Sequence, residues 1–474
     1  MSFEEILTKI DNFVWGIPLI VLVLAAGVVL TIRTGLIQVF HLPRALKYMF
    51  KDEEGGEGEV SGFASLCTAL SATIGTGNIV GVATAVGILA GGPGALFWMW
   101  AAAFLGMATK YAEGFLAVKY RTIDSEGRVL GGPFYYIENG MGSKWKWLAK
   151  LFAFFGACVG LMGIGTFSQV NGIASAVTLF FDPEGKNTIN ILGGDYSIVT
   201  VIASFVIAIC AGLVIMGGLK RISKVSEVVV PFMAILYVVS VVVLIITNLE
   251  KLPSALKDIF EGAFGLRAVS GGALGAILMS MRTGIARGIF SNESGLGSAP
   301  IAAAAAKTNE PVRQGLISMT GTFIDTIIIC TMTGISIIMM GSWADPALEG
   351  VQVTTDAFRK GLGFLPSQIP AFILMVCLVF FAFTTILGWD YYGEKCLEYL
   401  SGKNKAAVMI YRVLYILFVF IGPYMTVSSV WTIADIFNGL MAFPNLLALF
   451  ALSGVVAADT KDYFRRLKNG EITD

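Results

Sequence analysis

The chain has little of what an enzyme or a metal protein needs. Its 474 residues include one histidine, His41, which nearly excludes a histidine-based metal site or proton relay. The six cysteines are scattered and form no CxxC pair, so neither a disulfide framework nor a zinc site is indicated. The sequence has no Walker motif and no serine in a GxSxG elbow, which argues against nucleotide-driven pumping and against hydrolysis.

Charge is scarce as well. Only 14% of the residues are charged, 56% are hydrophobic, and the mean hydropathy is +0.77. A soluble domain is typically about one quarter charged. Lys and Arg together (33) balance Asp and Glu (33), so the net charge gives no indication of nucleic-acid binding. The composition predicts an integral membrane protein whose main partner is the lipid bilayer.

Hydrophobic runs of helix length follow one another along most of the chain. A membrane-spanning helix needs roughly 20 apolar residues. We predict an all-α membrane protein with eleven such helices, over residues 13–32, 62–90, 95–118, 148–181, 197–218, 226–248, 268–290, 315–341, 367–394, 407–427 and 432–457.

Lysine and arginine gather in every second connection between these runs. The connection 33–61 carries four of them, whereas 91–94 carries none. The segments on the side with fewer basic residues hold seven lysines and arginines in all: Lys9, Lys186, Lys251, Lys257, Arg267, Arg359 and Lys360. Because positive charge is retained on the cytoplasmic side, this alternation predicts a multi-pass protein of the cell membrane with its N-terminus outside and its C-terminus in the cytoplasm.

Two of the predicted helices are irregular. The second contains Gly75, Thr76, Gly77 and Asn78 at its middle, and the seventh contains Gly271, Gly272, Gly275 and Gly284. Glycine is a poor residue inside a helix, and freed backbone groups at membrane depth are tolerated where they line a cavity or lie within the protein. Close helix packing through the small residues is the alternative interpretation.

The positions of the two irregular helices predict two halves. They lie five helices apart and run in opposite directions, as do corresponding interrupted helices in the inverted halves of transporters. We therefore divide the chain into an extra N-terminal helix with its cytoplasmic connection (1–61), a first five-helix unit (62–248), a second, inverted unit (249–457) and a cytoplasmic tail (458–474).

Several charged residues lie inside predicted helices. Asp325 lies near the middle of the eighth, where it could be a cation ligand, a proton carrier or the partner of Arg282 or Arg287. Lys110 and Glu113 share one face of the third helix, which favours an ion pair. Glu293, near the end of the seventh helix, is expected to belong to a gate or salt-bridge network with the same two arginines.

Polar and aromatic residues add a second set of candidates. Gln169 and Asn171 are two positions apart, so at most one of them points at a given target. The Thr384 and Thr385 hydroxyls suit sodium, although Thr often bonds its own helix backbone. Trp389, one turn after Thr385, could limit the size of a small cavity, with ordinary packing as the alternative.

An interrupted helix has a clear preference for what it binds. The exposed N–H groups of one half attract an anion and the exposed C=O groups of the other attract a cation. A small zwitterion next to a sodium ion satisfies both ends. Gly75 and Gly77 leave room for a carboxylate to approach the backbone.

The residues also resemble a known family, the alanine or glycine:cation symporters. The matching stretches are Thr73–Ala83, Gly91–Ala95, Met107–Glu113, Gly131–Pro133, Arg287–Glu293, Gly321–Thr326 and Gly388–Lys395, which together extend over nearly the whole chain. The resemblance implies a LeuT-like 5+5 inverted repeat and uptake of alanine or glycine with sodium, less often with protons. It implies no organic cofactor and no enzymatic activity.

The resemblance also assigns residues. Gly75, Thr76, Gly77 and Asn78 would hold the substrate carboxylate, and the pocket would be completed by Gln169, Asn171, Thr385 and Trp389. Sodium would lie among the backbone carbonyls near Ala72 and Gly75 and the hydroxyls of Thr384 and Thr385, with Asp325 as a further candidate. Asp390 departs from the family pattern, where a small residue such as Ser is expected.

Three alternatives remain beside a sodium symporter of alanine or glycine. One is a proton-coupled symporter of the same substrates, since Asp390 leaves the coupling ion open. Another is an ion channel, against which the asymmetric helices and the lack of a charged ring argue. The last is a membrane enzyme, against which the lack of a nucleophile–base pair argues.

Overall fold

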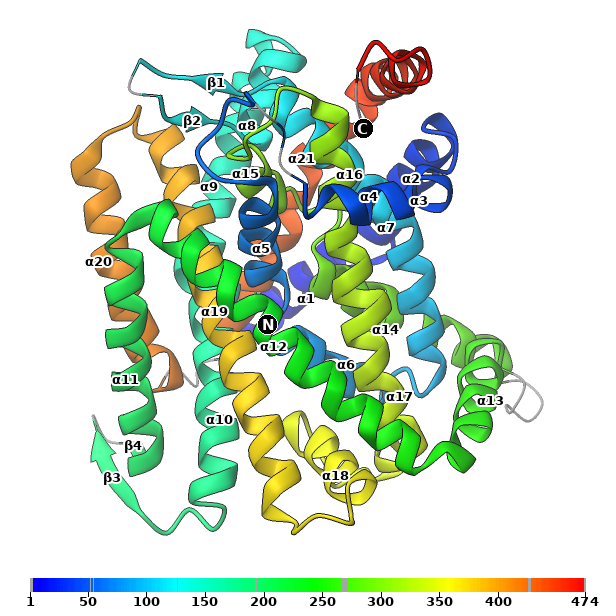
Figure 1. Ribbon diagram of the computed structural model, residues 1–474. Coiled ribbons are helices and arrows are strands. Elements are labelled where there is room, and N and C mark those ends of the chain that lie inside the picture. Colours follow the sequence, from blue (N-terminus) through cyan, green and yellow to red (C-terminus); the bar gives the residue numbers. More distant parts are fainter. Residues whose placement is uncertain are drawn as a thin grey trace.

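The computed structural model describes residues 3–51, 53, 55–125, 127–191, 194–265, 272–424 and 428–472. Helices make up most of it, and they run alongside one another as a bundle (Figure 1). Two short antiparallel hairpins join them: β1 (Thr122–Ile123) pairs with β2 (Val129–Leu130), and β3 (Thr188–Ile191) pairs with β4 (Gly194–Ser197). The predicted helical class is confirmed.

Eight helical segments in the described part of the chain are long and apolar enough to cross a membrane, and a bent pair of helices would be a ninth. The eight are Glu4–Arg33, Ser143–Phe181, Ile198–Ile215, Gly218–Thr247, Pro311–Met339, Gln368–Leu400, Lys405–Tyr424 and Thr432–Lys468, and the pair is Gly62–Thr73 with Gly77–Val86. Each coincides with a predicted span. The other two predicted spans fall on α7 (Gly94–Lys119) and α14 (Ala273–Asn292), which do not meet the same measure of apolar composition. The count of eleven and the orientation of the termini therefore stay predictions.

The remaining helices, with π and 3-10 helices labelled η, have the following bounds. They are α1 (Phe3–Val14), α2 (Ile17–Arg33), α3 (Ile37–Phe40), α4 (Leu42–Tyr48), α5 (Gly62–Thr73), η1 (Gly77–Gly81), α6 (Val82–Val86), α8 (Pro133–Tyr135), η2 (Tyr136–Gly140), η3 (Ser143–Trp145), α9 (Lys146–Met162), η4 (Ile164–Ser168), α10 (Gln169–Phe181), α11 (Ile198–Ile215), α12 (Gly218–Thr247), η5 (Leu249–Lys251), α13 (Leu252–Ala263), α15 (Ala299–Ala303), α16 (Pro311–Thr322), η6 (Phe323–Cys330), α17 (Thr331–Met339), η7 (Ser342–Ala344), α18 (Val351–Gly361), α19 (Gln368–Leu400), α20 (Lys405–Ile421), η8 (Gly422–Tyr424) and α21 (Ser428–Lys468).

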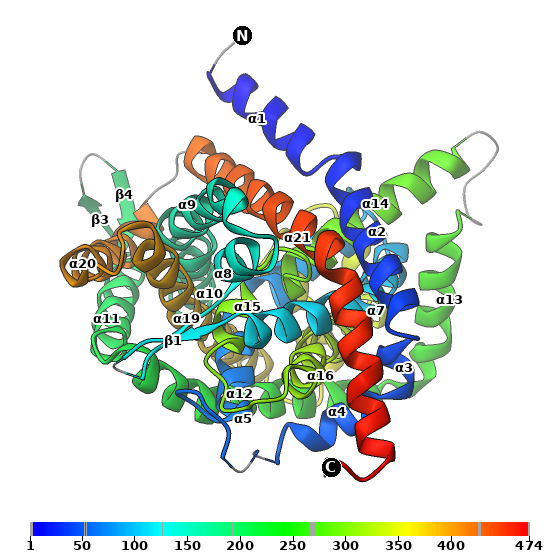
Figure 2. The ribbon, with the colours of Figure 1, turned by 90° about the horizontal axis from the view of Figure 1, so that it is seen from above.

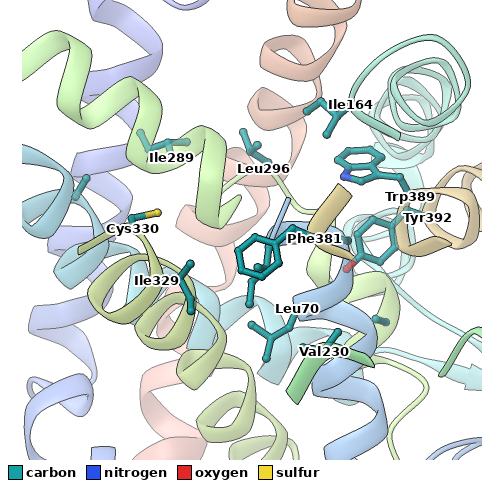
Figure 3. Close-up of a cluster of buried hydrophobic side chains, with 14 of the residues drawn as sticks. Leu70, Ile164, Val230, Ile289, Leu296, Ile329, Cys330, Phe381, Trp389 and Tyr392 are labelled. Atoms are coloured by element: carbon teal, nitrogen blue, oxygen red, sulfur yellow. The ribbon is translucent and has the colours of Figure 1, made fainter. Parts of the chain in front are cut away.

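Helix α5 lies among the longer helices of the bundle (Figure 1). In the view from above, α15 lies toward the middle, whereas α11, α20 and α13 lie at the edge (Figure 2). Helix α7 packs against α14 and α16, and α19 packs against α9, α10 and α5. The surrounding apolar side chains, among them Phe381 and Trp389, are fully buried (Figure 3). This packing places the broken second span at the centre of the protein.

The second span is interrupted where the sequence predicts it. Helix α5 ends at Thr73, the backbone of Ile74 is extended (φ −78°, ψ 93°), and the helix resumes at Gly77 with a bend of 54°. The π-helices η4 and η6 lie within the fourth and eighth predicted spans. Three of the inner helices thus depart from regular α geometry near the centre.

The seventh span differs from the prediction. Helix α14 runs without a break through Gly275 and Gly284, and Gly271 lies outside the described residues. A Cβ added to Gly284 would collide with the backbone of Ala95, so this glycine allows close contact between α14 and α7. The alternative interpretation, close packing, is therefore correct at Gly284.

Candidate functional site

The break in the second span is held by side chains from other elements. The Gly75 N–H donates to Asn78 Oδ1 at 2.9 Å, and the Thr76 N–H donates to Gln169 Oε1 at 3.0 Å. On the other side of the break, the Ile74 carbonyl accepts a bond from the Thr385 hydroxyl at 3.2 Å. Backbone groups freed by the break thus find polar partners, as they must away from water.

Gly75 has no room for a side chain. A Cβ at this position would stand 2.5 Å from Thr385 Oγ1 and 2.9 Å from Gln169 Oε1. Both of those atoms are the ones that bond the broken backbone. Gly75, Gln169 and Thr385, which come from three different predicted spans, therefore meet at one point.

The resumed half-helix faces open space. A cavity of about 250 Å³ is lined by Thr76 and Gly77 on one wall and by Ile164, Ser168 and Phe290 on others. It is smaller than the roughly 300–1,000 Å³ typical of pockets for drug-sized ligands, so its size suits a small solute.

A larger cavity adjoins the first one. It measures about 690 Å³, shares Thr76 and Ser168 with the smaller cavity, and extends past Asn171 to Asp182 and Gly350. These last two residues belong to connections that the charge pattern predicts to be external. Gln169 points at the break whereas Asn171 lines the larger cavity, so the two amides have different targets, as their spacing predicts.

Asp325 is fully buried in η6 and is bound by neutral donors. Its Oδ1 accepts from Asn78 Nδ2 at 2.7 Å, and its Oδ2 accepts from the hydroxyls of Ser291 (3.0 Å) and Thr326 (2.7 Å). The network joins the eighth span to the residue that caps the break in the second.

The structure does not pair Asp325 with an arginine. Arg282 and Arg287 line a third cavity of about 280 Å³ together with Asp11 and Asp435, and Arg287 and Asp435 also line the smaller cavity beside the break. Among the described residues, no lysine or arginine nitrogen forms an ion pair with Asp325 within 4.0 Å. Pairing of Asp325 with Arg282 or Arg287 is therefore wrong, and its roles as a cation ligand or a proton carrier stay predictions.

The sodium candidates on α19 point in different directions. The Thr385 hydroxyl contacts the carbonyl of Ile74 across the break (3.2 Å) and that of Phe381 in its own helix (3.1 Å). The Thr384 hydroxyl contacts the carbonyls of Phe380 (3.1 Å) and Phe381 (3.0 Å), both in its own helix. Ala72 packs directly against Gly388, where a Cβ would stand 2.7 Å from the Ala72 methyl carbon. The α5–α19 contact thus brings Ala72, Gly75 and Thr385 together, with the Thr384 hydroxyl turned back on its own helix.

Trp389 is buried behind the wall of the smaller cavity. It is not among the residues lining either cavity next to the break. Its indole Nε1 donates to Glu293 Oε1 at 3.0 Å, and its ring packs edge-on against Tyr392 at 5.6 Å. Figure 3 shows Trp389 beside Ile164, one of the cavity-lining residues.

Two predicted charge networks have different partners. Lys110 and Glu113 form no mutual ion pair within 4.0 Å; instead Lys110 Nζ donates to the Glu293 carbonyl (3.4 Å) and Glu113 accepts from the Gly295 N–H (3.1 Å) and from Asn445 (2.7 Å). Glu293 bonds Trp389 and Ser298 rather than Arg282 or Arg287. The spacing of residues along a helix identifies which side chains share a face, but it does not identify which residues of other elements contact that face.

Sequence reasoning missed several residues of this region as members of a network. Ser291 and Thr326 bind Asp325, and Asn292 donates to the Thr326 hydroxyl at 3.0 Å. The only signal was their place in the stretches Arg287–Glu293 and Gly321–Thr326, which carry the family resemblance.

Comparisons with known proteins agree with the fold and the resemblance. A family model described as the sodium:alanine symporter family matches residues 1–474. An uncharacterized transporter of Haemophilus influenzae is 56% identical over 99% of this chain and 98% of its own length. The sodium/alanine symporter AgcS of Methanococcus maripaludis is 45% identical over 99% of both chains, and the probable sodium/glutamine symporter GlnT of Bacillus subtilis is 37% identical over 99% of this chain and 92% of its own.

A solved structure supports the fold. The crystal structure of MhsT in complex with L-phenylalanine matches with a TM-score of 0.56 and 14% identity, over 86% of this chain and 99% of that chain. At this identity the match shows the fold alone, which is LeuT-like. With the family model matched from end to end, the chain belongs to the sodium:alanine symporter family, whose members are secondary transporters that couple a cation to an amino acid and are not enzymes.

Proposed function

We propose that this chain couples sodium entry to the uptake of a small neutral amino acid, alanine or glycine, across the cell membrane by alternating access. The observation that carries the proposal is the break at residues 74–76, beside a small cavity at the centre of the protein. The printed name of AgcS, a sodium/alanine symporter, favours this ion and this substrate.

The substrate site is proposed at the break. The N–H groups of Gly75, Thr76 and Gly77 would hold the carboxylate, with Asn78 and Gln169 giving up their present bonds to the backbone as the ligand arrives. Replacing a side-chain acceptor by a carboxylate is favourable, because bonds to charged groups contribute about 1.5–3 kcal/mol against about 1 kcal/mol for neutral ones. Asn171 and Thr385 would complete the pocket, and Trp389 would limit it from behind the wall that Ile164 forms.

Sodium is proposed to bind beside the substrate, at two sets of oxygen atoms. One set is the carbonyls near Ala72 and Gly75 with the hydroxyls of Thr384 and Thr385. The other is the Asp325 carboxylate with the hydroxyls of Ser291 and Thr326, which lie 3.0 Å and 2.7 Å from Asp325 Oδ2. Hard cations prefer oxygen ligands, and a buried carboxylate without an ion pair calls for a cation or a proton.

We also propose the membrane arrangement that the charge pattern predicts. The N-terminus would lie outside and the C-terminus in the cytoplasm, with 62–248 and 249–457 as inverted halves around the site. Both cavities next to the break would then open to the outside.

The two threonines of α19 give a matched test of the first ion site. Thr385→Ala is expected to raise the sodium concentration for half-maximal alanine uptake about tenfold, because one ligand and one bond to the Ile74 carbonyl are lost. Thr384→Ala is the control, with a smaller rise, since the Thr384 hydroxyl contacts its own helix and Met233 rather than the broken backbone. Unchanged sodium dependence in both variants would remove the hydroxyls from the site.

Uptake of radiolabelled alanine into proteoliposomes tests the function itself. A sodium gradient imposed at equal pH is expected to drive accumulation, and a proton gradient without sodium is expected to drive none. Accumulation with the proton gradient alone would favour the proton-coupled alternative, which the printed name of a 35% identical relative, a putative sodium/proton-dependent alanine carrier protein of Bacillus subtilis, keeps open. Flux without counterflow of labelled for unlabelled alanine would indicate a channel.

A further inference from the structure

Glu293 is in an unusual position for a charged residue. It follows the last residue of α14 with a left-handed backbone (φ 56°), which side-chain-bearing residues rarely adopt, and it is buried. Such conformations persist where the surroundings fix them, and they cluster at functional sites. The conformation of Glu293 is therefore fixed by its contacts with the rest of the protein and not by the preference of its own backbone.

Both carboxylate oxygens of Glu293 are used. Oε1 accepts from Trp389 Nε1 at 3.0 Å, and Oε2 accepts from the Ser298 hydroxyl at 2.5 Å. The backbone is fixed as well, by a bond from its N–H to the Ile289 carbonyl at 2.8 Å and by Lys110 on its carbonyl. With so many bonds, the carboxylate fixes the indole of Trp389 in one orientation.

Trp389 in turn supports the wall of the smaller cavity. A Cβ on Gly165 would stand 2.6 Å from the Trp389 Cβ, so α19 and η4 are in direct contact at this point. The Trp389 indole, which Glu293 binds, lies beside Ile164 of η4 (Figure 3). Ile164 and Ser168, at the two ends of η4, line the cavity opposite Thr76 and Gly77. A shift of Trp389 therefore moves the wall that limits the space beside the broken helix.

We propose that Glu293 is a positioning residue that limits the size of the substrate. It fixes the indole of Trp389, and Trp389 in turn supports η4, which forms one wall of the smaller cavity. This inference rests on the proposed function, since it assigns the cavity beside the break to the amino acid. The carboxylate touches no substrate; it acts through the indole and the η4 backbone.

The test is a ratio of transport efficiencies for alanine and for valine, measured as sodium-dependent uptake. Glu293→Leu keeps a side chain of similar size without an acceptor, and Trp389→Phe keeps an aromatic ring without the N–H. Each is expected to lower the alanine-to-valine ratio about tenfold, because one bond to a charged group is lost. Glu293→Gln retains an acceptor oxygen and is expected to stay within about threefold of the wild-type ratio.

Glu113→Gln is the matched control. The Glu113 carboxylate holds the same loop through the Gly295 N–H and Asn445 but makes no bond to Trp389. The Glu113→Gln variant is expected to change the uptake of alanine and of valine by the same factor, so the alanine-to-valine ratio stays as in wild type. The double variant Glu293→Leu with Trp389→Phe is expected to match the single variants, because both remove the same bond.

Several outcomes would overturn the inference. They are an unchanged ratio in Glu293→Leu, a change in Glu113→Gln or Glu293→Gln as large as that in Glu293→Leu, or additive effects in the double variant. Because Glu293→Gln and Trp389→Phe are conservative, the comparison stands even where Glu293→Leu is poorly folded. Absence of sodium-driven alanine uptake by the wild-type protein would instead overturn the proposed function, so the two failures are distinguishable.

Discussion

Asp325→Asn is expected to raise the sodium concentration for half-maximal alanine binding by about 100-fold or more. The substitution keeps the size of the side chain but removes the charge, and a hundredfold change corresponds to about 2.7 kcal/mol. Within the described part of the chain, the Asp325 carboxylate accepts hydrogen bonds from Asn78, Ser291 and Thr326, none of which carries a charge that could replace the cation. The measurement is binding of radiolabelled alanine to purified protein over a sodium titration at constant ionic strength.

The control for this result is a carboxylate away from the site. Asp345→Asn changes an exposed residue whose Oδ1 accepts the Ala347 N–H at 2.9 Å, and sodium dependence should stay as in wild type. An Asp325→Asn protein that elutes as a single species and binds alanine with wild-type sodium dependence would remove Asp325 from the ion site.

Gly75→Ala should reduce alanine uptake to less than about 1% of wild type. The added methyl would stand 2.5 Å from Thr385 Oγ1 and 2.9 Å from Gln169 Oε1, so at least one of these groups must leave the broken backbone. Overpacking of this kind typically costs about 1–3 kcal/mol in stability, and here the lost geometry is that of the proposed substrate site. Uptake in proteoliposomes at saturating sodium measures the effect.

Gly81→Ala is the matched substitution for this test. It lies in the same interrupted span and lines the smaller cavity, but its added Cβ would meet nothing within 4 Å. Both changes add one methyl group to a glycine of this span, so the difference between them reports the tight contact at Gly75 in the break. Equal uptake by the two variants would mean that the tight fit around Gly75 has no role in transport.

The break itself could be predicted from the sequence, because its cause is local. Gly75 and Gly77 weaken the helix where Thr76 and Asn78 offer polar groups, and the chain departs from helical geometry at Ile74. The same reasoning was wrong at Gly284, where a glycine in an unbroken helix serves close packing instead. Glycine alone does not separate the two cases; the polar residues beside it do.

The partners of the buried charges could not be predicted in this way. Asp325 was open to pairing with Arg282 or Arg287, but those arginines line cavities that Asp325 does not, and neither forms an ion pair with it in the described part of the chain. Lys110 and Glu113 share a helix face, yet both reach to the loop that follows α14. Which helices face each other is decided by tertiary packing, and a single sequence carries no direct signal of it.

The most direct test of the central claim is a structure determined with alanine and sodium bound. The account predicts an amino acid in the cavity of about 250 Å³, with its carboxylate within hydrogen-bonding distance of the N–H groups of residues 75–77 and a cation beside it. An amino acid bound elsewhere, such as between Arg282 and Asp11, with residues 74–76 still bonded to Asn78, Gln169 and Thr385, would contradict it.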